Sequence, residues 1–413
     1  MPGLTRSVTA YVPPRRVRRA GALTLVFAGV VAAGAATGAW GVVSRPHQGP
    51  TTLARDGDRT VARPAGSLPA ARGGVDRDPL DDAAARARED GKSGTDAAAE
   101  VLGRSGDTWS AVYSAREYEG FALALDGAYV GVGLTVRRAG GGVIEVDGVR
   151  PGGPAERAGI VPGDRLRTVD GAEVTGRPVT EVVSLLRGLT PAGAGSGVRL
   201  GLERDDRRWE RTLHRERLVT PSVQVERVDG EDEAAPATVI KVAAFTRGTG
   251  ERVRDAVRAA APGEGVLLDL RGNSGGLITE ATTAASAFLD GGPVATYDIR
   301  GRQHALRAEP GGDTRRPLVV LVDGGTMSAA ELLAGALQDR GRAIVVGAPT
   351  FGKGSVQMPT RLADGSVAEL TVGHYRTPSG RAVDDSGIVP DLVVRGDAEH
   401  RARTVLSGLG GGS

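Results

Sequence analysis

The stretch "PLVVLVDGGTMSAAELLAGALQD", residues 317–339, sets the pattern for the C-terminal half of the chain. Its apolar run predicts a buried strand, a glycine-containing turn follows, and "AAELLAGALQD" predicts a helix. The same order occurs in "GVLLDLRGNSGGL" (265–277) with the helical "ITEATTAASAFL" after it, and "RAIVVGAP" (342–349) predicts a third strand. Such repeats predict a layered α/β (mixed α+β) core over residues 206–396.

A smaller, β-rich domain is expected upstream, over residues 118–205. "YVGVGLTVRR" (129–138) and "VIEVDGV" (143–149) alternate apolar and polar positions, as half-buried strands do. Pro154 is placed to begin a short helix in "GGPAERAGIVPGDRL", and the apolar face of "PVTEVVSLLRGL" predicts a second helix.

Composition excludes several classes of function. The 413 residues allow two or three domains, and a net charge of only +2 gives no reason to expect nucleic acid as a partner. The absence of cysteine excludes disulfides, thiol catalysis and cysteine-based metal sites. Of the 52 basic side chains only three are lysines, namely Lys92, Lys241 and Lys353.

The N-terminus predicts export. Residues 1–19 carry five arginines and precede an uncharged run, residues 20–43, which is long enough to cross a bilayer as a single transmembrane helix. The arginines predict a cytoplasmic N-terminus and a remainder outside the membrane. The alternative is a cleaved signal peptide, because "AGA" at 33–35 resembles a small-residue cleavage site. Both alternatives place the rest of the chain beyond the cytoplasm.

Three further segments are assigned from composition and spacing. Residues 44–98, rich in Ala, Arg, Asp, Gly and Pro, are expected to form a flexible linker with a short helix near 80–90. Residues 99–117 are expected to form a helical segment that packs on the core. The last segment, 397–413, ends in "GLGGGS" and is expected to be a disordered tail.

The histidines give little support to metal or Ser-His-Asp chemistry. None pairs at helical spacing with another histidine, and none sits in the apolar strand–turn context expected of a catalytic base; they stand at positions His47, His214, His304, His374 and His400. No metal site and no cofactor are therefore predicted.

Serine activated by lysine is the remaining way to make a hydroxyl nucleophilic. Ser328 stands where the predicted strand enters the predicted helix. The helix N-terminus there supplies unpaired N–H groups that can hold an oxyanion. The alternative for Ser328 is a simple helix N-cap, a position that serine often fills.

Lys353 has the chemistry of a general base. A lysine can serve as a base once burial disfavours its charged form, whereas an arginine cannot be deprotonated in a protein. Gln357 follows four positions later, and its amide could accept a hydrogen bond from the lysine amine and so direct the nitrogen lone pair.

A competing interpretation of "VVGAPTFGKGSVQ" (345–357) is a phosphate-binding loop, since it contains G-x-x-x-x-G-K. That loop needs Ser or Thr after the lysine and a helix beginning there. Position 354 is Gly, and "SVQMPTRLADGS" predicts a strand and a hairpin instead. The nucleotide-binding interpretation is therefore rejected.

The segment "GGPAERAGIVPGDRL" resembles the signature of PDZ domains in bacterial proteases. In such domains a peptide adds as a strand at a sheet edge, and a glycine-containing loop holds its terminal carboxylate. The resemblance assigns that loop to "YVGVG", residues Tyr129, Val130, Gly131, Val132 and Gly133. The alternative is a PDZ fold used only for packing or partner docking.

From about residue 100 to 396 the chain resembles the carboxyl-terminal processing peptidases, the PDZ-containing serine peptidases also called tail-specific proteases. The resemblance rests on the order of the PDZ signature and four further motifs: "LLDLRGNSGG", "GGTMSAAELLAGALQD", "VVGAPTFGKGSVQ" and "YRTPSGRAVDDSGIVPDLVV". It implies an inserted PDZ domain, with residues before 118 packing on the core after 206. Polypeptides with free, flexible C-termini are the implied substrates, with the membrane as a second partner; a homo-oligomer is left open.

Carried over by motif, Ser328 is the nucleophile, Lys353 the general base and Gln357 the residue that orients the lysine. The implied oxyanion donors are the backbone N–H groups of Ala329 and Gly275. Two positions depart from the usual pattern of the family: Ser274 stands where proline is usual, and Met327 where alanine is frequent. Asp339 matches an acidic position of unassigned role. A catalytically silent PDZ scaffold that binds protein C-termini is the alternative function.

Overall fold

The computed structural model describes residues 77–188, 193–230, 236–299 and 302–410. The predicted basic segment and membrane anchor, residues 1–43, lie outside the described residues. Among the residues that the structure does describe, no helix has the length and apolar character that crossing a membrane requires.

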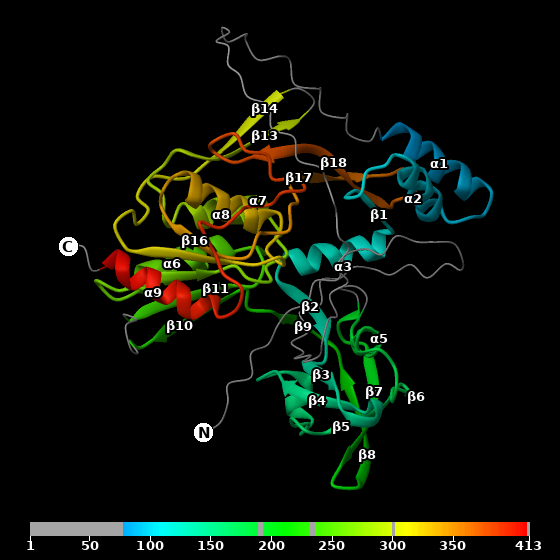
Figure 1. Cartoon of the computed structure of the whole chain (residues 1–413). Coiled ribbons are helices and arrows are strands. Elements are labelled where there is room, and N and C mark those ends of the chain that lie inside the picture. The colour runs from blue at the N-terminus through cyan, green and yellow to red at the C-terminus, as the bar shows by residue number, and fades with distance from the viewer. Residues whose placement is uncertain (1–76, 189–192, 231–235, 300–301, 411–413) are drawn as a thin grey trace, which may run out of the picture.

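A six-stranded sheet forms the centre of the larger unit (Figure 1). Its strands pair in parallel except at one edge, where β10 runs antiparallel to β11. Two inner strands are buried along their whole length, which is why their sequences are continuous apolar runs. In spatial order the strands are β10 (Val223–Val228), β11 (Ala237–Val242), β12 (Gly265–Asp269), β15 (Leu318–Val322), β16 (Ile344–Gly347) and β19 (Leu392–Val393).

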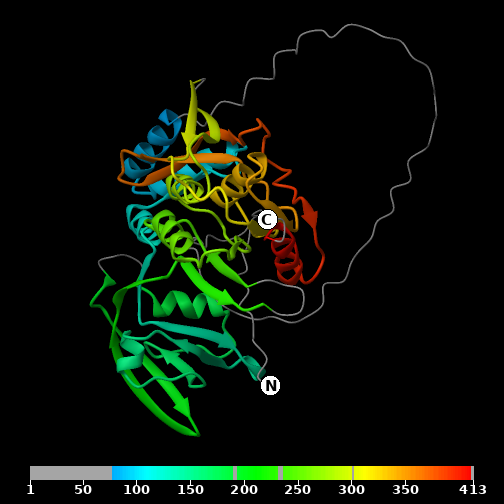
Figure 2. The same ribbon diagram turned by 90° about the vertical axis from the view of Figure 1, so that its left-hand side faces the viewer.

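Helices cover both faces of this sheet, which confirms the predicted layered α/β core. One face packs against three helices, α6 (Thr249–Ala259), α7 (Ile278–Ala285) and α8 (Ala329–Asp339). The other face packs against α9 (Ala398–Gly410), drawn in red in Figure 2. The prediction of a disordered tail over 397–413 is therefore wrong for α9, because Ala402 and Leu406 are buried against the sheet.

A second sheet packs beside α8 and carries the N-terminal helices. Its strands are β1 (Ala111–Tyr113), β18 (Val367–Arg376), β13 (Pro293–Ile299) and β14 (Arg302–Arg307), with β17 (Ser355–Arg361) paired to β18. The β17–β18 pair confirms the strand and hairpin predicted after Lys353.

Two helices that the sequence placed within a flexible linker, α1 (Asp78–Glu89) and α2 (Gly94–Arg104), pack against the β17–β18 hairpin. The linker prediction for 44–98 is wrong from residue 78 onward. Leu80 is fully buried and contributes to a small apolar cluster with Leu362 and Leu370 of the hairpin. These contacts stabilise two short alanine-rich helices: α1 matches the short helix predicted near 80–90, whereas α2 begins within the segment predicted as linker. The segment 99–117 is helical only at its two ends, with β1 between α2 and α3 (Ala115–Leu125).

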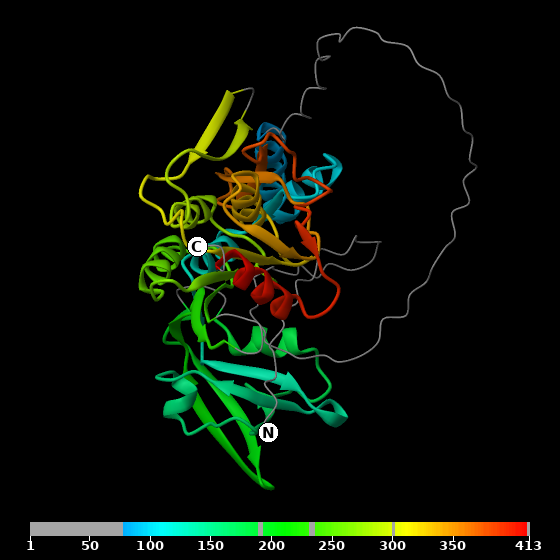
Figure 3. The same cartoon turned by 60° about the vertical axis from the view of Figure 1, so that its left-hand side comes forward.

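The smaller unit has its own sheet (Figure 3). It also has its own core, in which Ile144, Leu166 and Leu200 are fully buried. It extends past the predicted end at 205, because β8 pairs with β7 along its whole length. Its elements are β3 (Leu134–Arg138), η1 (Gly140–Gly142), β4 (Ile144–Val149), α4 (Pro154–Arg157), β5 (Arg165–Val169), β6 (Ala172–Glu173), α5 (Val179–Leu186), β7 (Gly197–Arg204) and β8 (Arg207–His214).

A two-stranded ribbon joins the two units. The chain leaves the core after α3 through β2 (Ala128–Gly131) and returns through β9 (Glu216–Val219), which pairs with β2 in antiparallel register. The smaller unit is therefore inserted into the larger one, and it hangs from the ribbon below the core in Figure 1.

Candidate active site

Ser328 immediately precedes α8 and has a backbone conformation that is uncommon for a side-chain-bearing residue, with φ 54° and ψ −118°. Such conformations cost on the order of 1–3 kcal/mol and persist only where neighbouring groups hold them. Here the Ser328 N–H donates to the Glu331 carboxylate at 2.8 Å, and its carbonyl accepts from the Tyr375 hydroxyl at 3.0 Å. Hydrogen bonds at both its N–H and its carbonyl therefore hold Ser328 in this conformation.

Glu331 connects the serine turn to the lysine turn. Its side chain is fully buried and accepts four hydrogen bonds. The donors are the Thr350 hydroxyl at 2.5 Å, the Gly352 N–H at 2.6 Å, the Ser328 N–H at 2.8 Å and the Lys353 N–H at 2.9 Å. One carboxylate thus binds the backbone of both Ser328 and Lys353. Glu331 was not among the residues predicted from sequence, although S-A-A-E at a helix start is a capping-box pattern.

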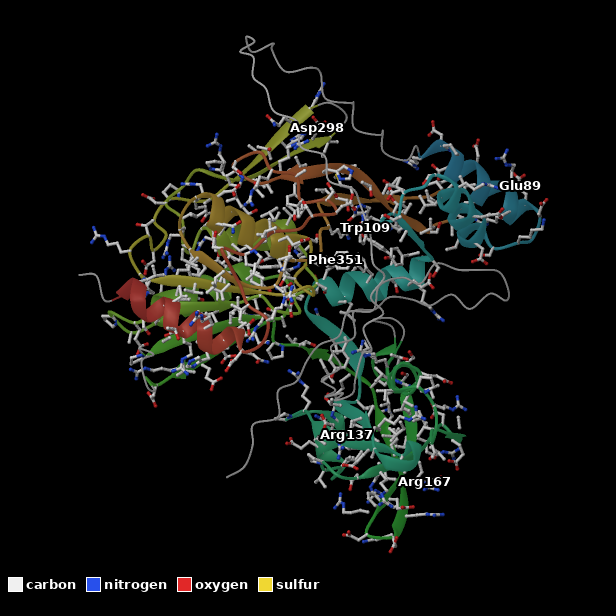
Figure 4. The ribbon with its side chains drawn as sticks, in the orientation of Figure 1. Glu89, Trp109, Arg137, Arg167, Asp298 and Phe351 are labelled. Atoms are coloured by element: carbon white, nitrogen blue, oxygen red, sulfur yellow. The ribbon has the colours of Figure 1, made fainter. Side chains whose placement is uncertain are left out.

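Lys353 lies in the loop between β16 and β17, largely removed from solvent. Its ammonium nitrogen is 4.9 Å from the centre of the Trp109 ring, which in turn meets Phe351 edge-on at 5.8 Å. Figure 4 labels Trp109 and Phe351, which lie together where the N-terminal segment meets the core.

Burial lowers the pKa of Lys353 below the usual lysine value, while the carboxylates of Glu369, Glu331 and Asp107 act in the opposite direction. The net lowering favours the neutral amine that a general base requires.

Gln357 lies on β17, directly opposite Thr371 of β18. Its amide nitrogen donates to the Ser355 hydroxyl at 2.9 Å and to the Thr371 hydroxyl at 3.2 Å. Both amide hydrogens are therefore engaged, and the carbonyl oxygen remains as the acceptor on the other side of the group.

Gly275 lies against the serine turn, but not as a free donor. A β-carbon at Gly275 would come within 2.9 Å of the Ser328 β-carbon, so the two backbones touch. Its N–H, however, donates to the Asn273 side-chain oxygen at 2.8 Å, so the predicted oxyanion role of Gly275 is not available in this conformation. Ala329 is the first residue of α8, and its N–H has no acceptor within the helix.

Of three other positions singled out from the sequence, Met327 and Asp339 hold neighbouring turns by hydrogen bonds. Met327 is buried and its N–H donates to the Asn273 carbonyl at 2.9 Å, whereas Ser274 is exposed. Asp339 accepts from the N–H and hydroxyl of Ser379 at 2.9 and 2.6 Å. These bonds tie the end of α8 to the turn after β18.

His374 pairs with Asp384 at 2.9 Å, a contact between distant positions that helical spacing could not predict. The other Asp384 oxygen accepts from the Gly354 N–H at 3.1 Å, next to Lys353. The hydrogen bond to Asp384 raises the pKa of His374. In the part of the chain that the structure describes, no group of three histidine, aspartate or glutamate side chains could hold a metal ion.

The predicted carboxylate loop is divided between two elements. Tyr129, Val130 and Gly131 belong to β2 of the ribbon, and the Tyr129 ring lies 4.9 Å from the Arg187 guanidinium. Only Val132 and Gly133 form the connection that leads into β3. That strand lies at the edge of its sheet and contacts α5.

Comparison with known proteins agrees with this geometry. A model of peptidase family S41 matches residues 237–394, and a PDZ domain model matches 145–192. The carboxyl-terminal-processing protease of Synechocystis sp. is 31% identical over 299 residues, which cover 71% of this chain and 69% of that protein. The carboxy-terminal processing protease CtpA of Bacillus subtilis is 31% identical over 299 residues, 69% of this chain and 60% of the relative.

Among solved structures, an S41 protease from Bacteroides fragilis shares the fold, with a TM-score of 0.50 at 18% identity over 75% of this chain and 90% of that one. The chain spans only 55–60% of the length of several curated relatives, which include peptidases of Bacillus subtilis and Arabidopsis thaliana. The family assignment rests on the two matching models together with the relative from Synechocystis. The chain therefore belongs to peptidase family S41, among the carboxyl-terminal processing peptidases that carry a PDZ domain.

Proposed function

We propose that the chain is a serine endopeptidase that hydrolyses peptide bonds in flexible polypeptides, with Ser328 as nucleophile and Lys353 as general base. The observation that carries the proposal is the buried Glu331 carboxylate, which binds the backbone N–H groups of both residues at 2.8 and 2.9 Å. The lowered pKa of Lys353 favours the neutral amine that the chemistry needs.

The proposed reaction is acyl transfer in two stages. The neutral Lys353 amine accepts the proton of the Ser328 hydroxyl while the serine oxygen attacks the substrate carbonyl carbon. The resulting ammonium then gives that proton to the departing amine as the peptide C–N bond breaks. In the second stage Lys353 takes a proton from water, whose oxygen attacks the acyl carbon, and Ser328 leaves with the proton restored to its oxygen.

Backbone donors at the start of α8 are proposed to hold the oxyanion. The Ala329 N–H lies at the positive end of the helix dipole, where negative charge is favoured. The Gly275 N–H would join it by exchanging the Asn273 oxygen, now 2.8 Å away, for the substrate oxyanion.

The PDZ domain is proposed to bind the C-terminus of the substrate. Its edge strand β3 is paired only on one side, by β4, so a peptide can add there as a further strand. Residues 20–43 are proposed to hold the chain in the cell membrane, with the peptidase core outside the cytoplasm.

Two substitutions test the proposed pair with an unstructured peptide as substrate. Ser328→Ala removes the nucleophile, and Lys353→Arg keeps a cation but removes the base; each should lower kcat/KM by about 10³-fold or more. Lys92→Arg is the matched control, because Lys92 is exposed and outside the site.

Circular dichroism of each variant checks the fold. Cleavage at the wild-type rate by either catalytic-pair variant would contradict the mechanism. A folded wild-type chain that binds peptide C-termini without cleaving them would favour the silent PDZ scaffold.

A further inference from the structure

A chain of polar contacts runs from Gln357 away from the proposed catalytic lysine and ends at a carboxylate in the N-terminal segment, Asp107. The contacts pass from the Gln357 amide to the Thr371 hydroxyl at 3.2 Å. From there they reach Asp107 through Ser110, whose hydroxyl oxygen is 3.4 Å from the Thr371 hydroxyl and 2.6 Å from the carboxylate. None of Thr371, Ser110 and Asp107 takes part in the proposed reaction itself.

Asp107 is held as an acceptor. Besides the Ser110 hydroxyl, the backbone N–H groups of Trp109 and Ser110 donate to it at 2.8 and 3.2 Å. Burial alone raises the pKa of Asp107, but these hydrogen bonds outweigh it and leave the pKa below its usual value. An ionised carboxylate can accept hydrogen bonds but cannot donate one.

Because the Asp107 carboxylate only accepts hydrogen bonds, it decides which group donates in each of these contacts. The Ser110 proton goes to Asp107 at 2.6 Å rather than to the Thr371 oxygen, which is 3.4 Å away. The Thr371 hydroxyl can then donate toward the Ser110 oxygen, and its own oxygen accepts from Gln357 at 3.2 Å. A side-chain amide next to a freely rotating hydroxyl could face it with either its oxygen or its nitrogen. Next to this hydroxyl only the nitrogen fits.

Ser110 also fixes the strand that carries Thr371. Its hydroxyl oxygen accepts the Thr371 N–H at 2.8 Å, so the side chain and the backbone of Thr371 are both held from the N-terminal segment. That segment places Trp109 over the Lys353 ammonium at 4.9 Å as well.

We propose that Asp107 and Thr371, held together by Ser110, are positioning residues that fix the orientation of the Gln357 amide. They turn its nitrogen toward Thr371 and leave its carbonyl oxygen as the acceptor for the Lys353 amine, which directs the lysine lone pair toward the serine. The proposal deepens the proposed function and rests on it.

The charged groups that face Lys353 come from three elements: Glu369 from β18, Glu331 from α8 and Asp107 from the segment before β1. Asp107 also acts on His374, whose partner is Asp384. Removing the Asp107 charge should therefore change the pH profile, whereas an uncharged change at Thr371 should not.

The first experiment compares Thr371→Val with Thr371→Ser in peptide cleavage. Valine keeps the shape and strand preference but lacks the hydroxyl, so we expect kcat to fall about 10- to 100-fold with KM changed less than about twofold. Serine keeps the hydroxyl and should stay within about threefold of the wild type. Equal losses in both variants, or none in Thr371→Val, would overturn the proposal.

A double-mutant cycle separates positioning from a general loss of structure. If Thr371 acts through Gln357, then Thr371→Val should have almost no further effect in a Gln357→Ala background. The same fold-loss in both backgrounds would show that Thr371 acts by another route. Thermal unfolding of each variant accompanies the cycle.

The Asp107→Asn variant tests the effect of the carboxylate charge on the pH dependence of cleavage. Asparagine can donate to the Ser110 oxygen and so remove the direction of the contacts, which should lower kcat. The loss of a carboxylate that favours the charged lysine should move the acidic limb of kcat/KM to lower pH. A fall in kcat without that movement would overturn the role of Asp107. The Ser328→Ala variant is assayed alongside: if it still cleaves, the proposed function fails, and if it is inactive while Thr371→Val is normal, only this inference fails.

Discussion

At the scale of single residues, Glu331 is the group on which the arrangement of the site most depends. It is fully buried, and its four donors come from both the serine turn and the lysine turn. A carboxylate satisfies four donors without needing to donate. Any replacement that carries hydrogens must leave some of these donors unpaired.

Glu331→Gln should therefore destabilise the fold and impair cleavage. Its NH₂ group would face backbone N–H groups that have lost their acceptor, at a cost of about 2–4 kcal/mol for groups of this kind. Denaturant unfolding measures the change in stability. Glu309→Gln is the control, because that side chain is 70% exposed in a surface pair with Arg254 and should change stability by less than about 0.5 kcal/mol. Equal effects in the two variants would contradict this role of Glu331.

The pH dependence of cleavage follows from the surroundings of Lys353. Only the neutral amine can act as a base, so activity should rise as the pH increases through the pKa of Lys353, which burial places below the usual lysine value. The Glu369 carboxylate favours the charged form and so raises that pKa.

Glu369→Gln should consequently lower the pKa of Lys353 and shift the acidic limb of the kcat/KM profile to lower pH. A pH–rate profile of the variant measures the shift. Glu119→Gln, an exposed change on α3, should leave the limb where it is. A shift of the acidic limb to higher pH in Glu369→Gln would mean that the limb reflects the titration of a group other than Lys353.

At the scale of elements, the site depends on the contact between the 272–276 turn and the start of α8. Gly275 has φ 95°, and a β-carbon there would lie 2.9 Å from the Met327 carbonyl and 2.9 Å from the Ser328 β-carbon. No side chain fits without moving the serine turn.

Gly275→Ala should reduce kcat at least about 100-fold, since displacing the serine turn by about 1 Å is enough for such a loss. Steady-state kinetics measures the effect. Gly311→Ala is matched for backbone strain, with φ 93°, but a β-carbon at Gly311 would meet no atom within 4 Å, so this variant should retain activity. Similar losses in both variants would point to backbone strain instead of the contact with Ser328.

At the scale of the whole molecule, the ribbon of β2 and β9 is the covalent connection between the PDZ domain and the peptidase core. Substrate capture and cleavage are therefore assigned to separate units. Under the proposed function, a substrate presents its C-terminus to one unit and its scissile bond to the other, which favours long, flexible polypeptides.

Capture of the terminal carboxylate predicts a preference between otherwise identical peptides. A peptide with a free C-terminus should be cleaved about tenfold or more efficiently than its C-terminal amide, because hydrogen bonds to a charged group contribute about 1.5–3 kcal/mol. Competition between the two peptides measures the ratio of kcat/KM. Acetylating the N-terminus removes a different terminal charge and should have little effect. Equal cleavage of the free and amidated peptides would exclude carboxylate capture.

The parts predictable from sequence were those with a local signal. The strands of the core are continuous apolar runs, the PDZ signature has fixed turn residues, and Gly354 with Pro359 excludes a phosphate loop within a few positions. Helix α9 was missed because Ala402 and Leu406 give a weak apolar face until a sheet is present to cover them.

The sequence by itself indicated the strand–turn–helix units of the core, because apolar periodicity and turn chemistry act between near neighbours. Its resemblance to the carboxyl-terminal processing peptidases implied the inserted domain and singled out Ser328 and Lys353 as the proposed pair. Only the tertiary structure decided which groups surround them. It placed Trp109 over Lys353, connected Asp107 through Ser110 to Thr371 of β18, and gave Glu331 its four donors. Burial and directional hydrogen bonds between distant segments exist only once those segments pack together, and no local pattern encodes them.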